Sequence, residues 1–282
     1  MSPNLSLGSF SSKKYFSLRF IFFITLISAS LFSKDIIFGV VPQQSPSELV
    51  KTWAPIVSYI SKETGLHLVF KTESSIPKFE EELYAGNYDI AYMSPYHFVV
   101  ANKQKGYKAI ARTTEQIEGI LVTHTNKRSF DINEFKGKTF LFPAPNAFAA
   151  TLLAKYELKK KYGFDIEKDA HVLYVNSHGS VYKGVARGVG DIGGGISRTL
   201  EQLHDNDTAS KIKILYKTDS YPSHPIAVLP SIENKDVGAI REALLKMPKD
   251  ILEKLTKTNS MIKTDSLEFD EIKKLAVELG KY

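Results

Sequence analysis

The sequence contains no cysteine. A disulfide framework, a thiolate-bound metal and a cysteine nucleophile are therefore excluded. A lipoprotein anchor is excluded as well, because such an anchor needs a cysteine to acylate. The 282-residue chain must be stabilised by hydrophobic cores alone, and its length is sufficient for one or two of them.

The chain also lacks a strong excess of charge of either sign. It has 37 Lys and Arg against 31 Asp and Glu, and three of the basic residues and none of the acidic ones fall in residues 1–33. The remainder is nearly neutral, and its basic and acidic side chains are interspersed. This pattern is typical of solvated helix faces, so no nucleic-acid partner is expected.

A long apolar run occurs only near the N-terminus. Three basic side chains precede "FIFFITLISASLF", residues 20–32, and small residues follow. This is the order of a secretory signal, and the run is shorter than the about 20 residues that a spanning helix needs. We expect residues 1–33 to be a signal peptide cleaved between Ser30 and Lys34, and the protein to lie in the periplasm. An uncleaved N-terminal anchor is the alternative.

After this segment, short apolar runs alternate with amphipathic ones. "DIIFGVVP" at 35–42, "LHLVFKTE" at 66–73 and "YDIAYMS" at 88–94 are typical of buried strands, and a helical pattern follows each. Serine followed by proline marks the start of the first and third helices. Pro55 is expected to kink or split the first helix. The order predicts a parallel sheet with helices on both faces.

The same rhythm is repeated further along the chain. Strands are predicted at "KTFLFP" (138–143), "AHVLYV" (170–175) and "KIKILYK" (211–217), with helices between them. The last part of the chain contains helical patterns without a sheet of their own. The sequence therefore predicts an α/β protein of two lobes, each a mostly parallel sheet flanked by helices.

We assign residues 34–122 to the first lobe and 123–221 to the second, and we expect residues 222–282 to return to the first. Two lobes joined by chain crossings, in an exported chain without disulfides, indicate a solute-binding protein that closes around a ligand. Ligands of open α/β sheets bind beyond the carboxyl ends of the strands, where turns lead into helix N-termini.

Four predicted strand-to-helix turns meet this description. They are Gln43–Ser45, Ser94–Tyr96, Ala144–Phe148 and Asn176–Ser180. If they face one cleft, they form a binding site built mostly from backbone N–H donors.

Three segments carry a family resemblance: "GNYDIAYMSPYHFVVA" (86–101), "FKGKTFLFPAP" (135–145) and "NSHGSVYKGVARGVGDIGGG" (176–195). They resemble the periplasmic binding proteins of phosphonate, phosphite and phosphate importers, the PhnD-like family. The resemblance extends over almost the whole chain after Asp35. It implies the two-lobed type II "Venus flytrap" fold, a phosphorus oxyanion as the small-molecule ligand, and delivery of that ligand to an ABC permease.

One segment departs from the family pattern. Members that bind phosphonates open the helix after "FPAP" with Ser-Thr-Ser-Gly, whereas here Ala147, Phe148, Ala149 and Ala150 stand in those places. Each hydrogen bond to a charged group contributes roughly 1.5 to 3 kcal/mol, so three missing hydroxyls weaken an anion site by several kcal/mol. The helix N–H groups remain. We expect the fold to carry over but not a tight phosphonate site.

The resemblance places His178 at a helix entrance in the second lobe. There, a protonated or Nε2–H imidazole can donate to an oxyanion, while a local hydrogen bond in the helix cap is the alternative. Tyr96 is either a ligand contact or part of the core, and capping is the alternative role of Asn146 and Ser94. The full set of expected ligand-binding residues is His178, Tyr96, Asn146, Ala147, Phe148, Ser94, Ser177 and Gln43.

Several aromatic residues can form either an apolar or cation-binding cage or simply the core. Ser223 and His224 lie near the expected hinge and are further candidates. The aromatic residues concerned are Tyr92, Phe98, Phe148, Tyr182 and Tyr221.

A hydrolase is the competing class of function. Ser177 and His178, together with Asp191, have suitable side chains, but adjacent Ser and His cannot easily adopt nucleophile–base geometry, and the G-x-S-x-G and H-E-x-x-H motifs are absent. We expect no enzymatic activity, no metal and no cofactor. Transport and sensing are not separated by the sequence, since both use lobe closure. The expected partner of this monomer is an ABC permease, with a membrane sensor kinase as the alternative.

Overall fold

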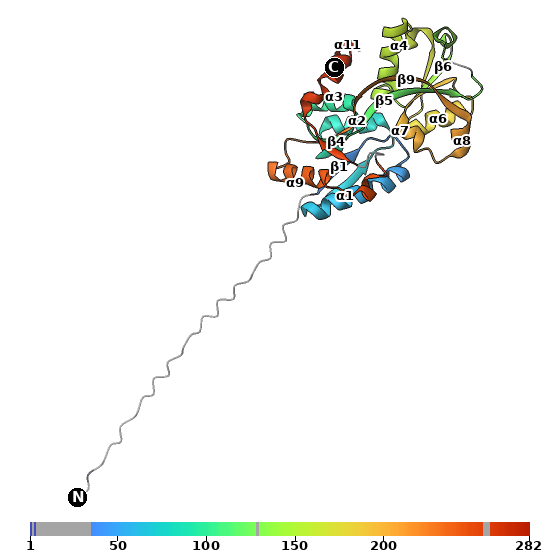
Figure 1. The fold of residues 1–282 in the computed structure, drawn as a ribbon. Coiled ribbons are helices and arrows are strands. Elements are labelled where there is room, and N and C mark those ends of the chain that lie inside the picture. Colours follow the sequence, from blue (N-terminus) through green and yellow to red (C-terminus); the bar gives the residue numbers. More distant parts are fainter. Residues whose placement is uncertain (2, 4–34, 128–129, 256–259) are drawn as a thin grey trace. The chain divides into compact units, whose positions relative to one another are not determined.

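The computed structural model describes Met1, Pro3 and residues 35–127, 130–255 and 260–282 (Figure 1). The expected signal peptide lies, apart from Met1 and Pro3, outside the described residues. Residues 33–282 form one compact unit, and the fold given below is that of this unit. In the described part of the chain, no helix is long and apolar enough to cross a membrane.

The first sheet has six strands in the order β11-β4-β10-β3-β1-β2. Strand β1 pairs in parallel with β2 and β3, whereas β10 is antiparallel to β3 and β4, and β11 is antiparallel to β4. The strands are β1 (Ile36–Val40), β2 (Leu68–Thr72), β3 (Ile90–Tyr92), β4 (Lys108–Thr113), β10 (Pro225–Val228) and β11 (Met261–Lys263).

The second sheet has five strands in the order β7-β6-β8-β5-β9. Strand β6 is parallel to β7 and β8, while β5 is antiparallel to β8 and β9. The strands are β5 (Gln116–His124), β6 (Thr139–Phe142), β7 (His171–Tyr174), β8 (Ile192–Ile196) and β9 (Ile212–Pro222).

Two α/β sheets are thus present as expected, but both are mixed rather than mostly parallel. The reason lies in the strands that carry the chain between the sheets. The chain enters the second sheet through β5 and leaves it through β9, and these long strands run antiparallel to each other. It then re-enters the first sheet through β10, which is inserted between β3 and β4.

The crossings between the sheets are short. The chain passes from β4 to β5 through residues 114–115, and from β9 to β10 through residues 223–224. We propose that the lobe boundaries lie at these crossings rather than at 122/123 and 221/222, because β5 then belongs entirely to the sheet with which it pairs.

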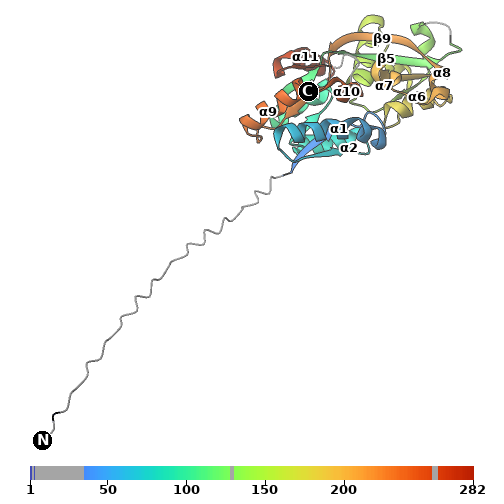
Figure 2. The same ribbon diagram turned by 60° about the horizontal axis from the view of Figure 1, so that its bottom comes forward.

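Helices flank both sheets, and Figures 1 and 2 show α1 and α9 at one end of the unit and α6 and α8 at the other. Those that follow or cover the first sheet are α1 (Pro46–Thr64), α2 (Ile76–Ala85), α3 (Pro95–Lys105), α9 (Asn234–Leu245), α10 (Lys249–Leu252), η3 (Ser266–Phe269) and α11 (Asp270–Glu278). Those of the second are η1 (Ile132–Phe135), η2 (Phe148–Leu153), α4 (Ala154–Tyr162), α5 (Ile166–Asp169), α6 (His178–Ala186), α7 (Ser197–Glu201) and α8 (Asn206–Lys211).

Helix starts follow from local sequence. Ser45, Ser94 and Ser177 each accept a hydrogen bond from a backbone N–H three residues later, which satisfies a donor that the helix itself leaves unpaired. Of the two effects expected of Pro55, a kink or a split, the split is wrong, since α1 is continuous from Pro46 to Thr64. Its buried face, which includes Trp53 and Ile56, packs on the core and offsets the missing backbone bond.

The hydrophobic core of the first lobe extends across to η2. Trp53 packs between Phe38 and Tyr92, with ring centroids 5.6 and 4.4 Å away. The same buried cluster includes Phe148 and Leu153 of η2, although η2 follows a strand of the second sheet. The entrance to η2 is therefore covered by both lobes.

Candidate ligand-binding site

An enclosed cavity lies where residues from both lobes meet. Its walls include at least one residue from each of the four predicted turns, namely Gln43, Ser94, Ala147 with Phe148, and His178. The cavity volume is about 10 Å³, which is room for about one water molecule. The four turns thus face one another across a closed and narrow space.

The wall contributed by η2 consists of backbone and apolar side chains. Ala147 precedes η2 with an extended backbone and no side-chain cap, and the N–H groups of Thr151 and Leu152 both donate to its carbonyl oxygen. The N–H groups at the first positions, Phe148 to Ala150, come before this first intrahelical bond. They are the donors that an anion at this helix start would use.

Two glycines bring η2 close to the second sheet. A β-carbon on Gly119 of β5 would lie 2.1 Å from the carbonyl oxygen of Ala149, and one on Gly194 of β8 would lie 2.1 Å from that of Ala150. Only glycine permits these approaches. The glycine-rich strand β8 therefore sets the position of the entrance to η2.

His178 lines the cavity and is neutral. Its side chain is 1% exposed, its Nδ1 lies 3.0 Å from Thr199 Oγ1, and its backbone N–H donates to the carbonyl oxygen of Gln43 at 3.3 Å. Burial, assisted by the positive charge of Arg198, lowers the pKa of His178 to about 3. Near neutral pH, His178 is therefore not the protonated imidazole that was one of the two expected forms.

Gln43 and His224 form a second polar group in the cavity wall. Gln43 Nε2 lies 3.0 Å from His224 Nε2, and Gln43 Oε1 accepts a hydrogen bond of 2.7 Å from Arg198 of α7. Arg198 also donates to the Tyr92 hydroxyl at 2.6 Å. Burial first, and then the charge of Arg198, hold the pKa of His224 well below its usual range, so this imidazole is neutral too.

His97 is a third histidine in the wall. It is 1% exposed, and neither ring nitrogen has a hydrogen-bond partner in the described structure. Its Nε2 lies 3.1 Å from Glu80 Oε1, but the two groups are not aligned for a hydrogen bond. Asn146 donates to the other oxygen of Glu80 at 3.3 Å. Asn146 therefore neither caps η2 nor lines the cavity.

The remaining expected residues divide into two groups. Ser94 caps α3 and also lines the cavity. Ala147 and Phe148, at the start of η2, line the cavity as well. Ser177 caps α6 without lining the cavity, and the Tyr96 hydroxyl donates to the carbonyl oxygen of Lys281 at 2.9 Å, away from it. The structure does not bring Tyr96 and Ser177 to the candidate site.

The aromatic residues considered as a cage belong to the hydrophobic core or pack against it, and among them Phe148 alone also lines the cavity. Phe148 lines the cavity and packs edge-to-face on Tyr221, with ring centroids 5.7 Å apart. Phe98 packs on Phe269 in the first lobe, and the Tyr182 hydroxyl donates to the backbone of β8. No aromatic cage surrounds the cavity within the described residues.

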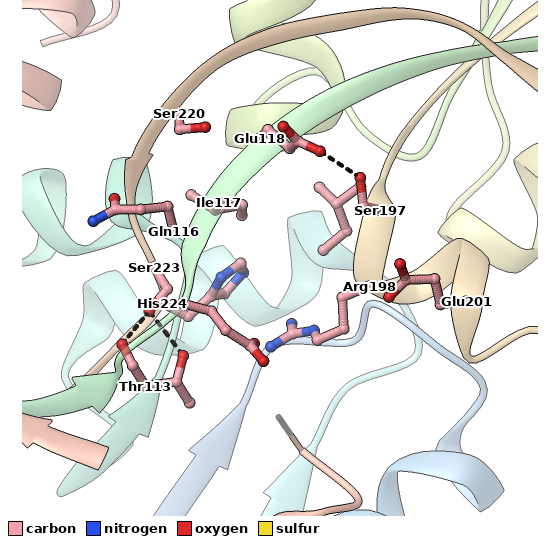
Figure 3. Close-up of a pocket in the computed structure, with 12 residues that line it drawn as sticks. Thr113, Gln116, Ile117, Glu118, Ser197, Arg198, Glu201, Ser220, Ser223 and His224 are labelled. Carbon is pink, nitrogen blue, oxygen red and sulfur yellow. Dashed lines mark hydrogen bonds between the residues drawn. The ribbon is translucent and has the colours of Figure 1, made fainter. Parts of the chain in front are cut away.

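A larger open pocket of about 430 Å³ lies beside the cavity and shares Ile117, Ile196 and His224 with it. Figure 3 shows Arg198 extending from α7 toward His224, and Ser197 bonded to Glu118. This pocket continues the cavity toward the two crossings between the lobes.

The residues of the hydrolase alternative are not assembled into a catalytic group. Asp191 accepts a hydrogen bond from the backbone N–H of Thr139 at 3.0 Å, while Ser177 caps a helix and His178 contacts Thr199. Each side chain has a separate structural partner, so the geometry provides no nucleophile–base pair here.

His97 and Arg198 were missed in the sequence, although local signals were present. His97 lies in the first turn of α3, three residues after its cap Ser94. Arg198 lies at a fifth strand-to-helix turn, where β8 leads directly into α7. A turn from a strand into a helix N-terminus was the feature that indicated the other four turns, and the turn at Ser197 has the same feature.

A family model and a curated relative both relate this chain to phosphonate or phosphate import proteins. The family model for the ABC transporter, phosphonate, periplasmic substrate-binding protein matches residues 38–268. The phosphate-import protein PhnD of Mycolicibacterium smegmatis is 24% identical over 185 residues, which is 59% of this chain. The matched region spans 56%, about half, of the length of that relative.

Solved structures share the fold. PhnD1 of Prochlorococcus marinus in complex with methylphosphonate superposes with a TM-score of 0.82 at 18% identity, covering 89% of this chain and 100% of that one. A binding protein component of an ABC phosphonate transporter from Pseudomonas aeruginosa gives 0.78 at 18% identity, covering 88% and 86%. The two-lobed α/β architecture and the match of the family model over most of the chain lead to one conclusion: the chain belongs to the periplasmic substrate-binding proteins of phosphonate ABC transporters.

Proposed function

We propose that this protein binds a small phosphorus oxyanion between its lobes and delivers it to an ABC permease in the membrane. The observation that carries the proposal is the convergence of the η2 entrance and two neutral, buried histidines, His178 and His224, on one enclosed cavity. A helix start provides backbone donors and a partial positive charge, which favour an anion.

The electrostatics of the cavity support an anionic ligand. Among the described residues, no carboxylate lines its wall, and the nearby Arg198 adds a positive charge to the surroundings. Neutral imidazoles can donate a hydrogen bond without a cost for burying a second charge. An oxyanion inside the cavity therefore contacts no carboxylate directly, although Glu80 lies behind His97 and Glu118 lines the adjoining pocket.

The dimensions favour a compact ligand. The cavity holds about 10 Å³, and the Phe148 ring occupies one of the places where the family has a small hydroxyl residue. The lobes have to separate for a ligand to enter, because contacts such as Gln44 to Gln202 join them. Because the closed cavity has room for only about one water molecule, it must also widen to hold a ligand, and phosphite or phosphate requires less widening than a phosphonate with a long substituent.

A thermal-shift and calorimetric panel on residues 34–282 tests the proposal. Phosphite, phosphate and methylphosphonate are compared with sulfate, small carboxylates and small cationic metabolites. A ligand that binds only the folded state at a hundredfold excess over its Kd stabilises it by about 2.7 kcal/mol. We expect a shift with at least one phosphorus oxyanion. A shift with none of them, but with a carboxylate or a cation, contradicts the proposal.

The membrane partner requires a separate test, since lobe closure is compatible with a permease or with a sensor kinase. We expect deletion of the gene to abolish uptake of the ligand identified in the panel, and the wild-type gene to restore it. Normal uptake combined with a changed transcriptional response to the ligand supports the sensor alternative instead.

A further inference from the structure

The His224 ring is held on three sides. It is 2% exposed, it lines the cavity, and it stacks on Tyr92 with ring centroids 5.1 Å apart and an interplanar angle of 19°. Its Nε2 lies 3.0 Å from Gln43 Nε2. The only side-chain hydrogen bond of the ring within the described part of the chain is this one to Nε2, so Nδ1 is left for another partner.

Arg198 determines which way the Gln43 amide points. A guanidinium group can only donate, so the Gln43 atom 2.7 Å from Arg198 must be the acceptor oxygen Oε1. A rotated amide would place its NH₂ group against the guanidinium. The Gln43 atom next to His224 is therefore the donor Nε2.

This amide orientation in turn fixes the protonation of the ring. Gln43 Nε2 donates, so His224 Nε2 must accept and carries no proton. The ring is neutral, and a neutral imidazole has one N–H group. That proton must be on Nδ1.

We propose that Arg198, through Gln43, holds His224 in the Nδ1–H form, so that His224 donates a hydrogen bond from Nδ1 to the oxyanion in the cavity. His224 is then a ligand-binding residue, and Gln43 and Arg198 are positioning residues. The ligand role of His224 rests on the proposed function, whereas the tautomer does not.

His224 differs in this respect from His178. The partner of His178 Nδ1 is the hydroxyl of Thr199, which can donate or accept, and the Tyr182 hydroxyl shares that oxygen at 2.8 Å. Contacts within the protein therefore leave both neutral tautomers open to His178. Ala147 and Ala149 provide no side-chain hydroxyl at the start of η2. His224 provides the cavity with an N–H donor whose position on the ring is fixed by contacts within the protein.

The tautomer can be measured without any ligand. Long-range ¹H–¹⁵N spectra of histidine-labelled protein distinguish protonated from unprotonated ring nitrogens, and the His224 signals are those missing from His224→Gln. We expect a protonated Nδ1 and an unprotonated Nε2 in the wild type, and loss of that single pattern in Arg198→Met. The matched control is Gln202→Ala, which removes a contact between the lobes to Gln44 but leaves Arg198 in place, and should keep the pattern. A protonated Nε2 in the wild type overturns the inference.

The ligand role is tested with a pair of variants. The Asn amide in His224→Asn lies near the place of Nδ1, and the Gln amide in His224→Gln lies near that of Nε2. For phosphite and methylphosphonate we expect Kd to rise about 10- to 100-fold in His224→Gln, as for a lost hydrogen bond to a charged group, and less in His224→Asn. Wild-type affinity in both variants excludes His224 from the site while the proposed function stands. If the wild type binds no phosphorus oxyanion, the proposed function and the ligand role of His224 both fail, and the spectra alone decide the tautomer.

Discussion

Gly194 of β8 lies directly against Ala150 of η2, such that a β-carbon on Gly194 would approach the Ala150 carbonyl oxygen to 2.1 Å. The same β-carbon would lie 2.4 Å from the ring of Phe142. The start of η2 can thus reach its place in the cavity wall only because a glycine stands opposite. Because Gly194 has no side chain, β8 can pack directly against the start of η2.

The first prediction concerns this glycine. Gly194→Ala should displace η2, destabilise the protein by about 1 to 3 kcal/mol through overpacking, and weaken ligand binding. Gly238→Ala is the control, because Gly238 lies within α9 with nothing within 4 Å of the added β-carbon. That change should stabilise the protein by about 0.5 to 1 kcal/mol. Urea unfolding measures both, and equal effects of the two variants would contradict the packing argument.

Restoring the hydroxyls should strengthen oxyanion binding. Ala147→Ser with Ala149→Ser adds two donors at the entrance of η2, and Phe148→Thr adds the third and removes the ring that packs on Tyr221. We expect the triple variant to bind phosphite or methylphosphonate at least tenfold more tightly, because each donor to an anion contributes roughly 1.5 to 3 kcal/mol. The loss of a buried aromatic ring will lower the unfolding free energy by about 3 kcal/mol. Calorimetry provides the affinities, and no gain in the triple variant counts against the role given to this turn.

The two neutral histidines predict a loss of stability in acid. Burial and the charge of Arg198 lower the pKa of folded His178 to about 3 from 6.5, and they shift His224 in the same direction. Between about pH 6.5 and 3 the unfolded chain binds more protons than the folded protein. The contribution of the neutral histidines to the free energy of unfolding is therefore fully present above about pH 6.5 and is lost as the pH decreases toward 3. For His178 alone, the loss between pH 7.5 and 5 is about 2 kcal/mol.

Urea unfolding at pH 7.5 and pH 5 checks this expectation. His178→Gln should show a smaller loss of stability between the two pH values than the wild type, whatever its stability at pH 7.5. The same pH dependence in both proteins would show that His178 is not buried in its neutral form.

Tyr96 provides a negative prediction. Its hydroxyl donates to the carbonyl oxygen of Lys281 and does not line the cavity. Tyr96→Phe should lower stability by about 1 kcal/mol and leave ligand affinity unchanged. A Kd raised as much as in His224→Gln would place Tyr96 in the binding site after all.

Local interactions explain how much of this protein could be predicted from its sequence. The serine caps Ser45 and Ser94 depend on neighbours within a few residues, so the starts of α1 and α3 were predicted correctly. The cap of α6, Ser177, was expected only as a ligand-binding residue. The strand-to-helix turns followed from the same signals. The alternation of strands and helices, together with the family resemblance, was sufficient for the two-lobed α/β fold.

Contacts between distant residues decided the rest. Nothing near Asn146 indicates that its partner is Glu80, 66 residues earlier, and nothing near Arg198 indicates that it bonds to Gln43 and Tyr92 in the other lobe. Which of several polar residues line the cavity depends on how the two sheets pack, as the separation of Tyr96 from Ser94 shows.

The sequence by itself therefore determined the two-lobed α/β fold and the turns from which a site could be built, but not strands β10 and β11. Only the tertiary structure decided the chemical state of that site. The pKa of an imidazole depends on the burial and charge that the whole fold places around it, and its tautomer depends on which partner reaches each nitrogen. The charge and the donors of the cavity consequently arise from residues far apart in the chain.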